Sequence, residues 1–449
     1  LWYNVVVEIS FFYILGHCPT RKQILLKREG VKMIEKNEYF DVEFTDMTHD
    51  GMGVCKIEGF PVFVANALKG EKGQIKITKM NSSFGFGRLI LLTETSPFRK
   101  EPICDHFSEC GGCNLMHMNY QMQLDFKKYR TAETLKKLGK VDTKVRDTVG
   151  MLNPYYYRNK AVVPFGEENG KMIAGLYKAR THDIIDMKRC YIIPKATTDI
   201  VKYLKNVFME LNIEAYKEST GEGIIRHVVI RNSHKFDDIS ITLVTATPKL
   251  PRKEILIKKL VNRYKKIVSI VQNYNPEKNN IILGKKSRVL YGEDFIRDEI
   301  NGVHFKISHR SFYQVNPVQT EELYKKAIEY AELTQDEVII DAYCGIGTIG
   351  LSAAKYAKTV LGVDVVSSAI RDAMANAAHN GITNSKFIVG MKGNDTFRFV
   401  TLNKPFTTSN LFLILSMTIF GFSPNLMVTT PPTDSIPFLS NAIGVFSLE

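Results

Sequence analysis

One glycine-rich turn between a strand and a helix constrains the fold more than any other feature of this chain. Residues 341–350 read Asp-Ala-Tyr-Cys-Gly-Ile-Gly-Thr-Ile-Gly, and an apolar run at 337–341 leads into them. A helix is predicted over 349–356 and a second strand over 359–363, which together form the opening of a doubly wound α/β domain. Asp364 ends that strand, where a carboxylate can accept both ribose hydroxyls of a nucleoside.

The glycine pattern alone does not identify the ligand, because NAD enzymes share it. Asp341 stands four residues before Gly345, and an acidic group there favours S-adenosylmethionine (SAM), which carries cationic groups and no pyrophosphate. We expect SAM, with a dinucleotide-dependent oxidoreductase as the alternative. Further along, Asn376 is expected on a solvated helix face and Asn380-Gly381 at a left-handed helix end.

A second constellation consists of cysteines. Cys104, Cys110 and Cys113 are spaced C-x5-C-x2-C around paired glycines, and Cys190 is the best fourth partner. Thiolates suit iron–sulfur clusters and zinc, and the spacing leaves a four-cysteine cluster, a zinc site and unrelated cysteines all open. The other three cysteines have competing explanations. Cys18 lies in a doubtful N-terminal run, Cys55 fits a barrel strand, and Cys344 lies in the glycine turn.

The chain separates into regions of different pattern. Residues 38–96 contain about five short alternating strands punctuated by glycine, which predicts a small OB-like β-barrel, a common platform for single-stranded nucleic acid. Residues 97–305 hold the cysteine loop and a basic helix over 120–138, followed by strands and helices in an α+β region. Residues 306–390 hold the glycine turn. The predicted class is a multidomain α/β protein with a Rossmann-like SAM-binding domain.

Residues 391–449 do not continue this pattern. They are rich in Phe, Leu, Ser, Thr and Pro, with six charged residues and no βα rhythm. We interpret them as an aberrant tail that leaves the SAM-binding domain incomplete. The sheet of that domain is then expected to end in an unpaired edge, which predicts poor solubility.

Charge and cysteine usage indicate the partner and the compartment. Sixty Lys and Arg residues against 47 Asp and Glu give a net charge of +13, and the whole excess lies upstream of the tail. This balance favours nucleic acid or an anionic membrane surface. Seven cysteines are too few for a disulfide scaffold, so a reducing, cytoplasmic location is expected. The apolar run at 5–15 is a poor signal peptide and too short to span a bilayer.

Four motifs, in this order, resemble the RNA uracil-C5 methyltransferases of the RumA/TrmA type, over roughly residues 35–390. They are the C-x5-C-G-G-C loop with its distant fourth cysteine, Tyr157-Arg-Asn-Lys, Ser311-Phe-Tyr-Gln-Val-Asn-Pro and the glycine turn itself. The resemblance implies a TRAM barrel, a middle region with an iron–sulfur loop, and an RNA substrate without a membrane or an obligate protein partner. It implies that SAM contacts Gln314, Tyr343, Gly345 and Asp364, and that a [4Fe–4S] cluster binds Cys104, Cys110, Cys113 and Cys190.

The reaction of that family needs a cysteine nucleophile. The thiolate adds to C6 of uracil, C5 then attacks the SAM methyl group, and a base removes the C5 proton as the thiolate leaves. The family places this cysteine in a Ser-Cys-Asn-Pro motif beyond the glycine turn, but residues 391–449 contain no cysteine, and Thr430 and Thr433 flank the only Pro-Pro pair there. The catalytic residues are therefore unknown.

The expected function is SAM-dependent methylation of C5 of a uridine in RNA, and 23S ribosomal RNA is favoured over transfer RNA as the substrate. This chain is expected to be inactive because it has lost its nucleophile. A non-catalytic RNA-binding iron–sulfur protein is the alternative. Within the motifs, Tyr157, Arg158 and Lys160 are expected to contact RNA, although a plain basic strand would have the same composition.

Overall fold

The computed structural model describes residues 34–390 and 411–415. By their contacts the chain divides between Ser96 and Pro97 into two compact units. Cys18, the N-terminal apolar run and the rest of the tail lie outside the described residues. None of the helices in the described part is long and apolar enough to cross a membrane.

The first unit is a six-stranded barrel rather than the five-stranded one expected. Its strands, in the sheet order β1-β5-β6-β4-β3-β2, pair antiparallel except β4 with β6, and β1 also contacts β3. Alternate residues such as Val62 and Val64 fill a core that includes Cys55. The strands are β1 (Tyr39–Glu43), β2 (Asp46–Met47), β3 (Gly53–Ile57), β4 (Phe60–Val64), β5 (Lys72–Met80) and β6 (Gly85–Glu94).

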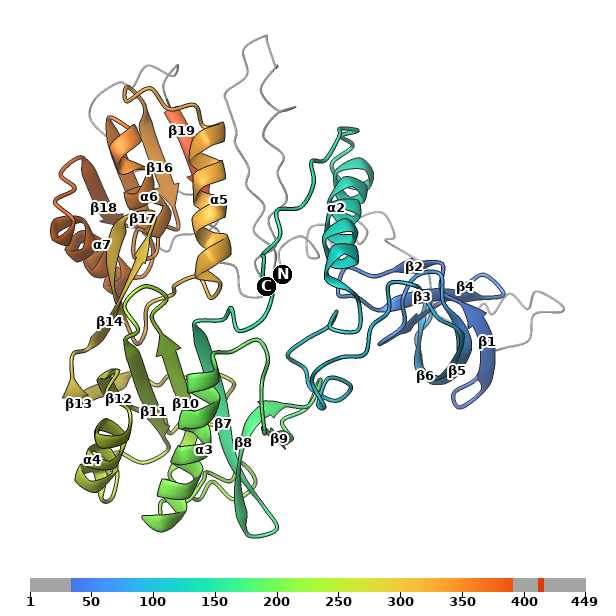
Figure 1. Cartoon of the computed structure of the whole chain (residues 1–449), viewed down its shortest axis with the longest axis horizontal. Helices are drawn as coiled ribbons and strands as arrows, with labels where there is room; N and C mark the ends of the chain where they lie inside the picture. The colour runs from blue at the N-terminus through green and yellow to red at the C-terminus, as the bar shows by residue number, and fades with distance from the viewer. Residues whose placement is uncertain (1–33, 391–410, 416–449) are drawn as a thin grey trace, which may run out of the picture. The chain divides into compact units, whose positions relative to one another are not determined.

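The second unit begins with the cysteine loop and α2 (Tyr120–Lys137), which leads into a seven-stranded mixed sheet. The side chain of Asn119 caps α2 by accepting the Met122 N–H. Two helices, α3 (Lys195–Glu210) and α4 (Lys253–Arg263), share one core with this sheet (Figure 1). In sheet order its strands are β13 (Lys286–Gly292), β12 (Ile267–Tyr274), β11 (Ile239–Thr245), β10 (Ile225–Asn232), β7 (Lys160–Glu168), β8 (Lys171–Tyr177) and β9 (Ile184–Asp186).

A hairpin of β14 (Phe295–Ile300) and β15 (Val303–Ser308) packs into the core of the next domain. The expected boundary at residue 305 falls within this hairpin and stays a prediction. The turn between the strands is Asn301-Gly302, and both residues have positive φ, as a two-residue hairpin turn of this sequence requires. That dipeptide was a signal in the sequence for the hairpin.

The remaining domain is a parallel sheet surrounded by helices (Figure 1). Helix α5 (Pro317–Tyr330) precedes β16 (Val338–Ala342), and α6 (Thr348–Ala353) with one 3-10 turn (Ala354–Tyr356) leads to β17 (Thr359–Asp364). Helix α7 (Ser367–His379) then leads to β18 (Ser385–Val389). The predicted multidomain α/β class with its βαβ opening is confirmed.

The edge of this sheet lies one strand beyond β16, because the tail supplies a further strand. A strand from the tail, β19 (Leu411–Leu415), pairs in parallel with β16, so the order is β18-β17-β16-β19. Backbone N–H and C=O groups along β16 therefore have partners on both sides. The composition of the tail concealed this strand, because five apolar residues without flanking βα rhythm do not distinguish a strand from other apolar segments.

Candidate functional site

The glycine turn lies at the carboxyl ends of β16 and β17, the edge of a parallel sheet at which ligands bind in doubly wound folds. Tyr343, Gly345 and Gly347 all have positive φ. The Cys344 N–H donates to the Val363 carbonyl at 3.0 Å, and the Gly347 N–H donates to the Cys344 carbonyl at 2.8 Å. These bonds fix the turn against the end of β17 before any ligand arrives.

Asp364 holds the same turn with its side chain. One carboxylate oxygen accepts the Gly345 N–H at 3.0 Å and the other accepts the Val366 N–H at 2.8 Å. A carboxylate oxygen has capacity for a second donor. The side chain is therefore oriented by the backbone and can still accept hydrogen bonds from hydroxyl groups of a ligand.

Asp341 lies beneath the turn and is fully buried. It accepts the Gly350 N–H through one oxygen at 3.0 Å, while the other oxygen has no partner among the described residues. Burial raises the pKa of Asp341 to about 7, and the nearby charge of Asp364 adds to the rise. Asp341 is therefore readily protonated near neutral pH and is not a fixed negative charge at the turn.

The glycines of the turn serve two different purposes. A Cβ atom on Gly345 would meet no atom within 4 Å, so the space above this residue is open to a ligand. A Cβ atom on Gly350 would lie 2.8 Å from the Asp341 Oδ2 and 3.0 Å from a Val360 methyl group. Gly350 is therefore needed for the packing of α6 on the sheet.

Gln314 lies on the segment between β15 and α5, and the middle region holds this segment in place. Asn159 donates from its side chain to the Gln314 carbonyl at 2.9 Å and from its backbone to the Val315 carbonyl at 2.8 Å. The neighbour of Gln314, Tyr313, shares a core with Cys344. The Tyr157-Arg-Asn-Lys motif therefore acts on the segment of Gln314, a role that the sequence analysis missed.

Asn376 also differs from its expected place. It is fully buried, accepts the Lys306 N–H at 2.9 Å, and joins α7 to the hairpin. The polarity of asparagine suggested a solvated helix face, but a buried amide is stable when it is hydrogen-bonded. Gly381 does end α7 with a φ of 65°, as expected.

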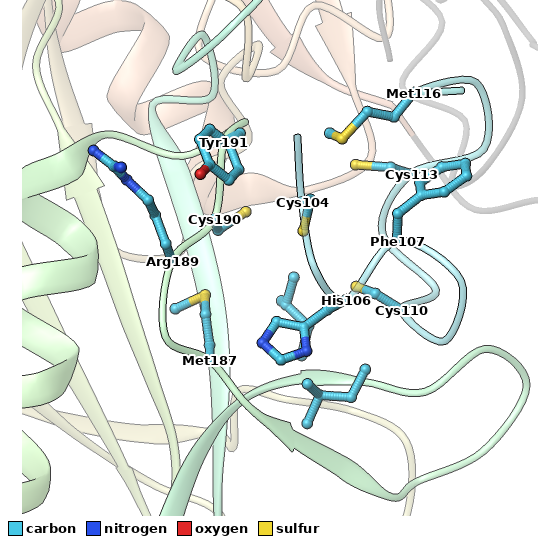
Figure 2. A pocket seen from close by; sticks show the side chains of 12 residues that line it. Cys104, His106, Phe107, Cys110, Cys113, Met116, Met187, Arg189, Cys190 and Tyr191 are labelled. Carbon is cyan, nitrogen blue, oxygen red and sulfur yellow. The ribbon is translucent and has the colours of Figure 1, made fainter. Parts of the chain in front are cut away.

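The four predicted cysteine ligands meet around one cavity, although Cys190 comes from a separate segment. Cys104, Cys110 and Cys113 line it from the loop, and Cys190 lines it from the segment after β9. Figure 2 shows the sulfur atoms directed toward the space between the two segments. The rest of the lining is largely apolar, including Phe107 and Met187.

Burial raises the pKa of the Cys110 and Cys190 thiols, which a bound cationic centre would reverse. Within residues 34–390 and 411–415, no group of three or more His, Cys, Asp or Glu side chains is arranged to hold a single metal ion. Thiols are the donors that both iron–sulfur clusters and zinc use.

The paired glycines of the cysteine loop have a packing role. Neither Gly111 nor Gly112 has positive φ, so a left-handed backbone conformation is not what requires glycine at these positions. A Cβ atom on Gly111 would lie 3.3 Å from the Ala179 Cα, and its N–H donates to the Tyr177 carbonyl at 3.1 Å. The glycines let the loop approach the end of β8.

Cys344 is not a candidate nucleophile in this structure. It is 2% exposed, and burial raises the pKa of its thiol. A neutral, enclosed thiol neither reaches a base nor supplies the thiolate. Cys344 packs in the hydrophobic core beneath the turn, and this packing explains a cysteine at this position.

Sequence comparisons agree with this geometry. A profile of the tRNA (uracil-5-)-methyltransferase family matches residues 119–408, and a TRAM domain profile matches residues 35–90. A protein of Listeria innocua that is named an uncharacterized RNA methyltransferase is 48% identical over 80% of this chain and 79% of its own length. Another from Clostridium acetobutylicum is 44% identical over 90% and 85%. The family match continues past Gly390, where the sequence analysis ended it.

A solved structure has the same fold. The tRNA (uracil-54, C5)-methyltransferase of Pyrococcus abyssi, in complex with S-adenosyl-L-homocysteine, superposes with a TM-score of 0.62 at 24% identity, over 78% of this chain and 79% of that one. Together with the family match across more than half of the sequence, these relatives show that the chain belongs to the tRNA (uracil-5-)-methyltransferase family of SAM-dependent RNA methyltransferases and carries a TRAM domain.

Proposed function

We propose that this chain binds SAM and RNA in the manner of an enzyme that methylates C5 of uridine, and that it lacks the nucleophile for the reaction. The observation that carries the first part is the glycine turn, in which Asp364 is oriented by two backbone N–H groups and the space over Gly345 is open. SAM supplies the methyl group when it is bound. The chain supplies a prearranged turn, two buried carboxyl groups and the segment of Gln314.

The proposed SAM contacts are Gln314, Tyr343, Gly345 and Asp364. Asp364 is suited to the ribose hydroxyls because each of its carboxylate oxygens accepts one backbone N–H and has a lone pair left for a further donor. Gln314 is suited to a polar part of the ligand, since its backbone is held by Asn159 and its side chain is only partly buried.

We further propose that Cys104, Cys110, Cys113 and Cys190 hold a [4Fe–4S] cluster. The donor set supports this proposal: four thiols line one apolar cavity, and soft thiolates favour iron–sulfur clusters or zinc over hard cations. Two backbone hydrogen bonds, from the Arg158 N–H to the Ile192 carbonyl and from the Tyr156 N–H to the Tyr191 carbonyl, connect the Cys190 segment to residues 156–159. Asn159 of that stretch holds the segment of Gln314. A cluster here would therefore organise the region between the two centres.

The second part of the proposal is supported by the cysteines of the described residues and by the sequence of the tail, which offer no accessible thiol for the reaction. Of the cysteines in the described residues, four line the cavity and two are buried in cores, Cys55 and Cys344. Residues 391–449 contain no cysteine. We expect the scaffold to bind its ligands without forming the covalent bond to C6 of uracil.

Nucleoside analysis tests the proposal. Anaerobically purified protein is incubated with SAM and unmodified ribosomal RNA, which we propose as the substrate class, or transfer RNA. We expect no 5-methyluridine from either RNA, while SAM raises the melting temperature and NAD does not. Formation of 5-methyluridine would show that a thiol outside our assignment is the nucleophile. Stabilisation by NAD instead of SAM would support the oxidoreductase alternative.

A further inference from the structure

A second pocket adjoins the cysteine cavity on the other side of its loop. Cys113 and Met116 line both cavities. The second one is a hollow that is partly open to solvent. Its other walls come from α2, the segment around Tyr155, and the start of α5. Neither the proposed SAM contacts nor the thiol ligand set accounts for this pocket.

The walls of this pocket are fixed by hydrogen bonds. The Tyr120 hydroxyl accepts the Met151 N–H at 2.7 Å. The side chain of Gln123 donates to the Leu115 and Met118 carbonyls at 3.0 and 2.9 Å, which ties the cysteine loop to α2. A pocket held in this way is formed before a ligand binds.

One buried acceptor in the lining has no partner. Gln319 is 5% exposed and donates to the Val149 carbonyl at 3.2 Å. Its Oε1 atom accepts no hydrogen bond from any described residue. A buried unsatisfied oxygen is costly and uncommon in folded proteins. It requires an N–H or O–H donor, which nucleobases present at their edges.

Cations and aromatic rings complete the lining. Lys100 donates to the Tyr155 hydroxyl at 3.0 Å and lies over the ring of Tyr155. That partner is neutral, so the charge of Lys100 stays available to an anion. Tyr120, Tyr155 and Tyr157 also line the pocket. Aromatic rings beside a lysine are the combination that binds a base and its phosphate in single-stranded RNA.

We propose that this pocket receives one unpaired nucleotide of the RNA, apart from the base at the SAM site. The base would lie against Tyr155, an N–H at its edge would donate to Gln319, and Lys100 would bind the phosphate. The proposal rests on the proposed function only in taking RNA as the ligand. Because the cysteine loop forms one wall, the thiol cavity and the nucleotide pocket share a structural element.

Affinity for a fluorescent oligouridylate, measured by anisotropy with the full chain, tests this assignment. We expect Tyr155→Leu to bind about tenfold more weakly, a typical loss for one base–aromatic contact. Gln319→Leu should also weaken binding, although it removes an unsatisfied buried oxygen. Tyr129→Leu, on the exposed face of α2, is the matched control and should bind like the parent protein.

The salt dependence provides a second measurement. Lys100→Ala should lower the slope of log affinity against log salt by about one, as for loss of one phosphate contact. Lys128→Ala is its control, because Lys128 on α2 is paired with Asp147 at 2.6 Å and does not line the pocket. Cross-linking of RNA that contains 4-thiouridine should modify residues of the pocket.

The outcomes separate the two proposals. Unchanged affinity and salt slope in the Tyr155, Gln319 and Lys100 variants would overturn the pocket assignment while RNA binding by the parent protein stands. Failure of the parent protein to bind oligouridylate would overturn both. The SAM-induced melting shift of each variant shows that it is folded, and it should be unchanged.

Discussion

The glycine turn and the cysteine cavity are built in opposite ways. The turn is local: Asp341 to Gly350 and the end of the next strand supply every group, and backbone hydrogen bonds hold them. The cavity joins a loop at 104–113 to a cysteine 77 residues later, and its four thiols line one space between these two segments (Figure 2). One contiguous stretch and the end of the next strand form the turn, whereas the cavity forms only where two distant segments meet.

The largest effect should follow from a change at the cavity. Cys113→Ser should reduce iron from about four per chain to near zero if the site is a four-cysteine cluster. It should also weaken RNA binding, because the loop forms a wall of the nucleotide pocket. Iron analysis and anisotropy measure the two effects. Cys344→Ala is the control, since it removes a buried thiol from another core, and iron retained in Cys113→Ser would contradict the ligand assignment.

At the turn, two glycine substitutions should separate packing from binding. Gly350→Ala places a methyl group 2.8 Å from the Asp341 carboxylate, so it should lower the free energy of unfolding by about 1–3 kcal/mol, as overpacking does. Gly345→Ala has open space but a φ of 56°, and should cost about 1 kcal/mol. It should nevertheless weaken SAM binding more than Gly350→Ala does at a temperature where both are folded.

Denaturant titrations and SAM calorimetry on both variants provide the check. Equal loss of SAM affinity in the two proteins would mean that the open space at Gly345 is not where the ligand lies.

A further effect concerns pH. Because burial raises the pKa of Asp341 to about 7, the folded protein binds a proton that the unfolded chain, with an ordinary aspartate, releases near pH 4. The contribution of this group to the free energy of unfolding should therefore fall as the pH rises from about 4 to 7, and it should stay low above pH 7. Asp341→Asn should gain stability relative to the parent protein over that interval. A constant difference between the two proteins would show that Asp341 is ionised throughout.

The contrast also explains what could be predicted from the sequence. Gly345 and Asp364 were found from a contiguous pattern, because their geometry follows from the strand and helix on either side. The meeting of Cys190 with the loop was proposed by elimination and resemblance, and its spatial basis, the pairing of Gly111 with the end of β8, has no local signal. The same limit hid the contact of Asn159 with the segment of Gln314.

Two errors had identifiable causes. Asn376 was expected in solvent because a single amide on a helix carries no sign of the hairpin that covers it. The strand at 411–415 was missed because its surroundings lack the strand and helix alternation that identified β16 and β17. In both cases the partner comes from a distant part of the chain.

The most direct test of the account measures both centres in one anaerobic sample: iron and sulfide content together with the stoichiometry of SAM binding. We predict about four irons per chain and one bound SAM, with SAM binding retained in Cys113→Ser after the iron is lost. Absence of SAM binding in the parent protein, or zinc in place of iron, would contradict the account of the corresponding centre.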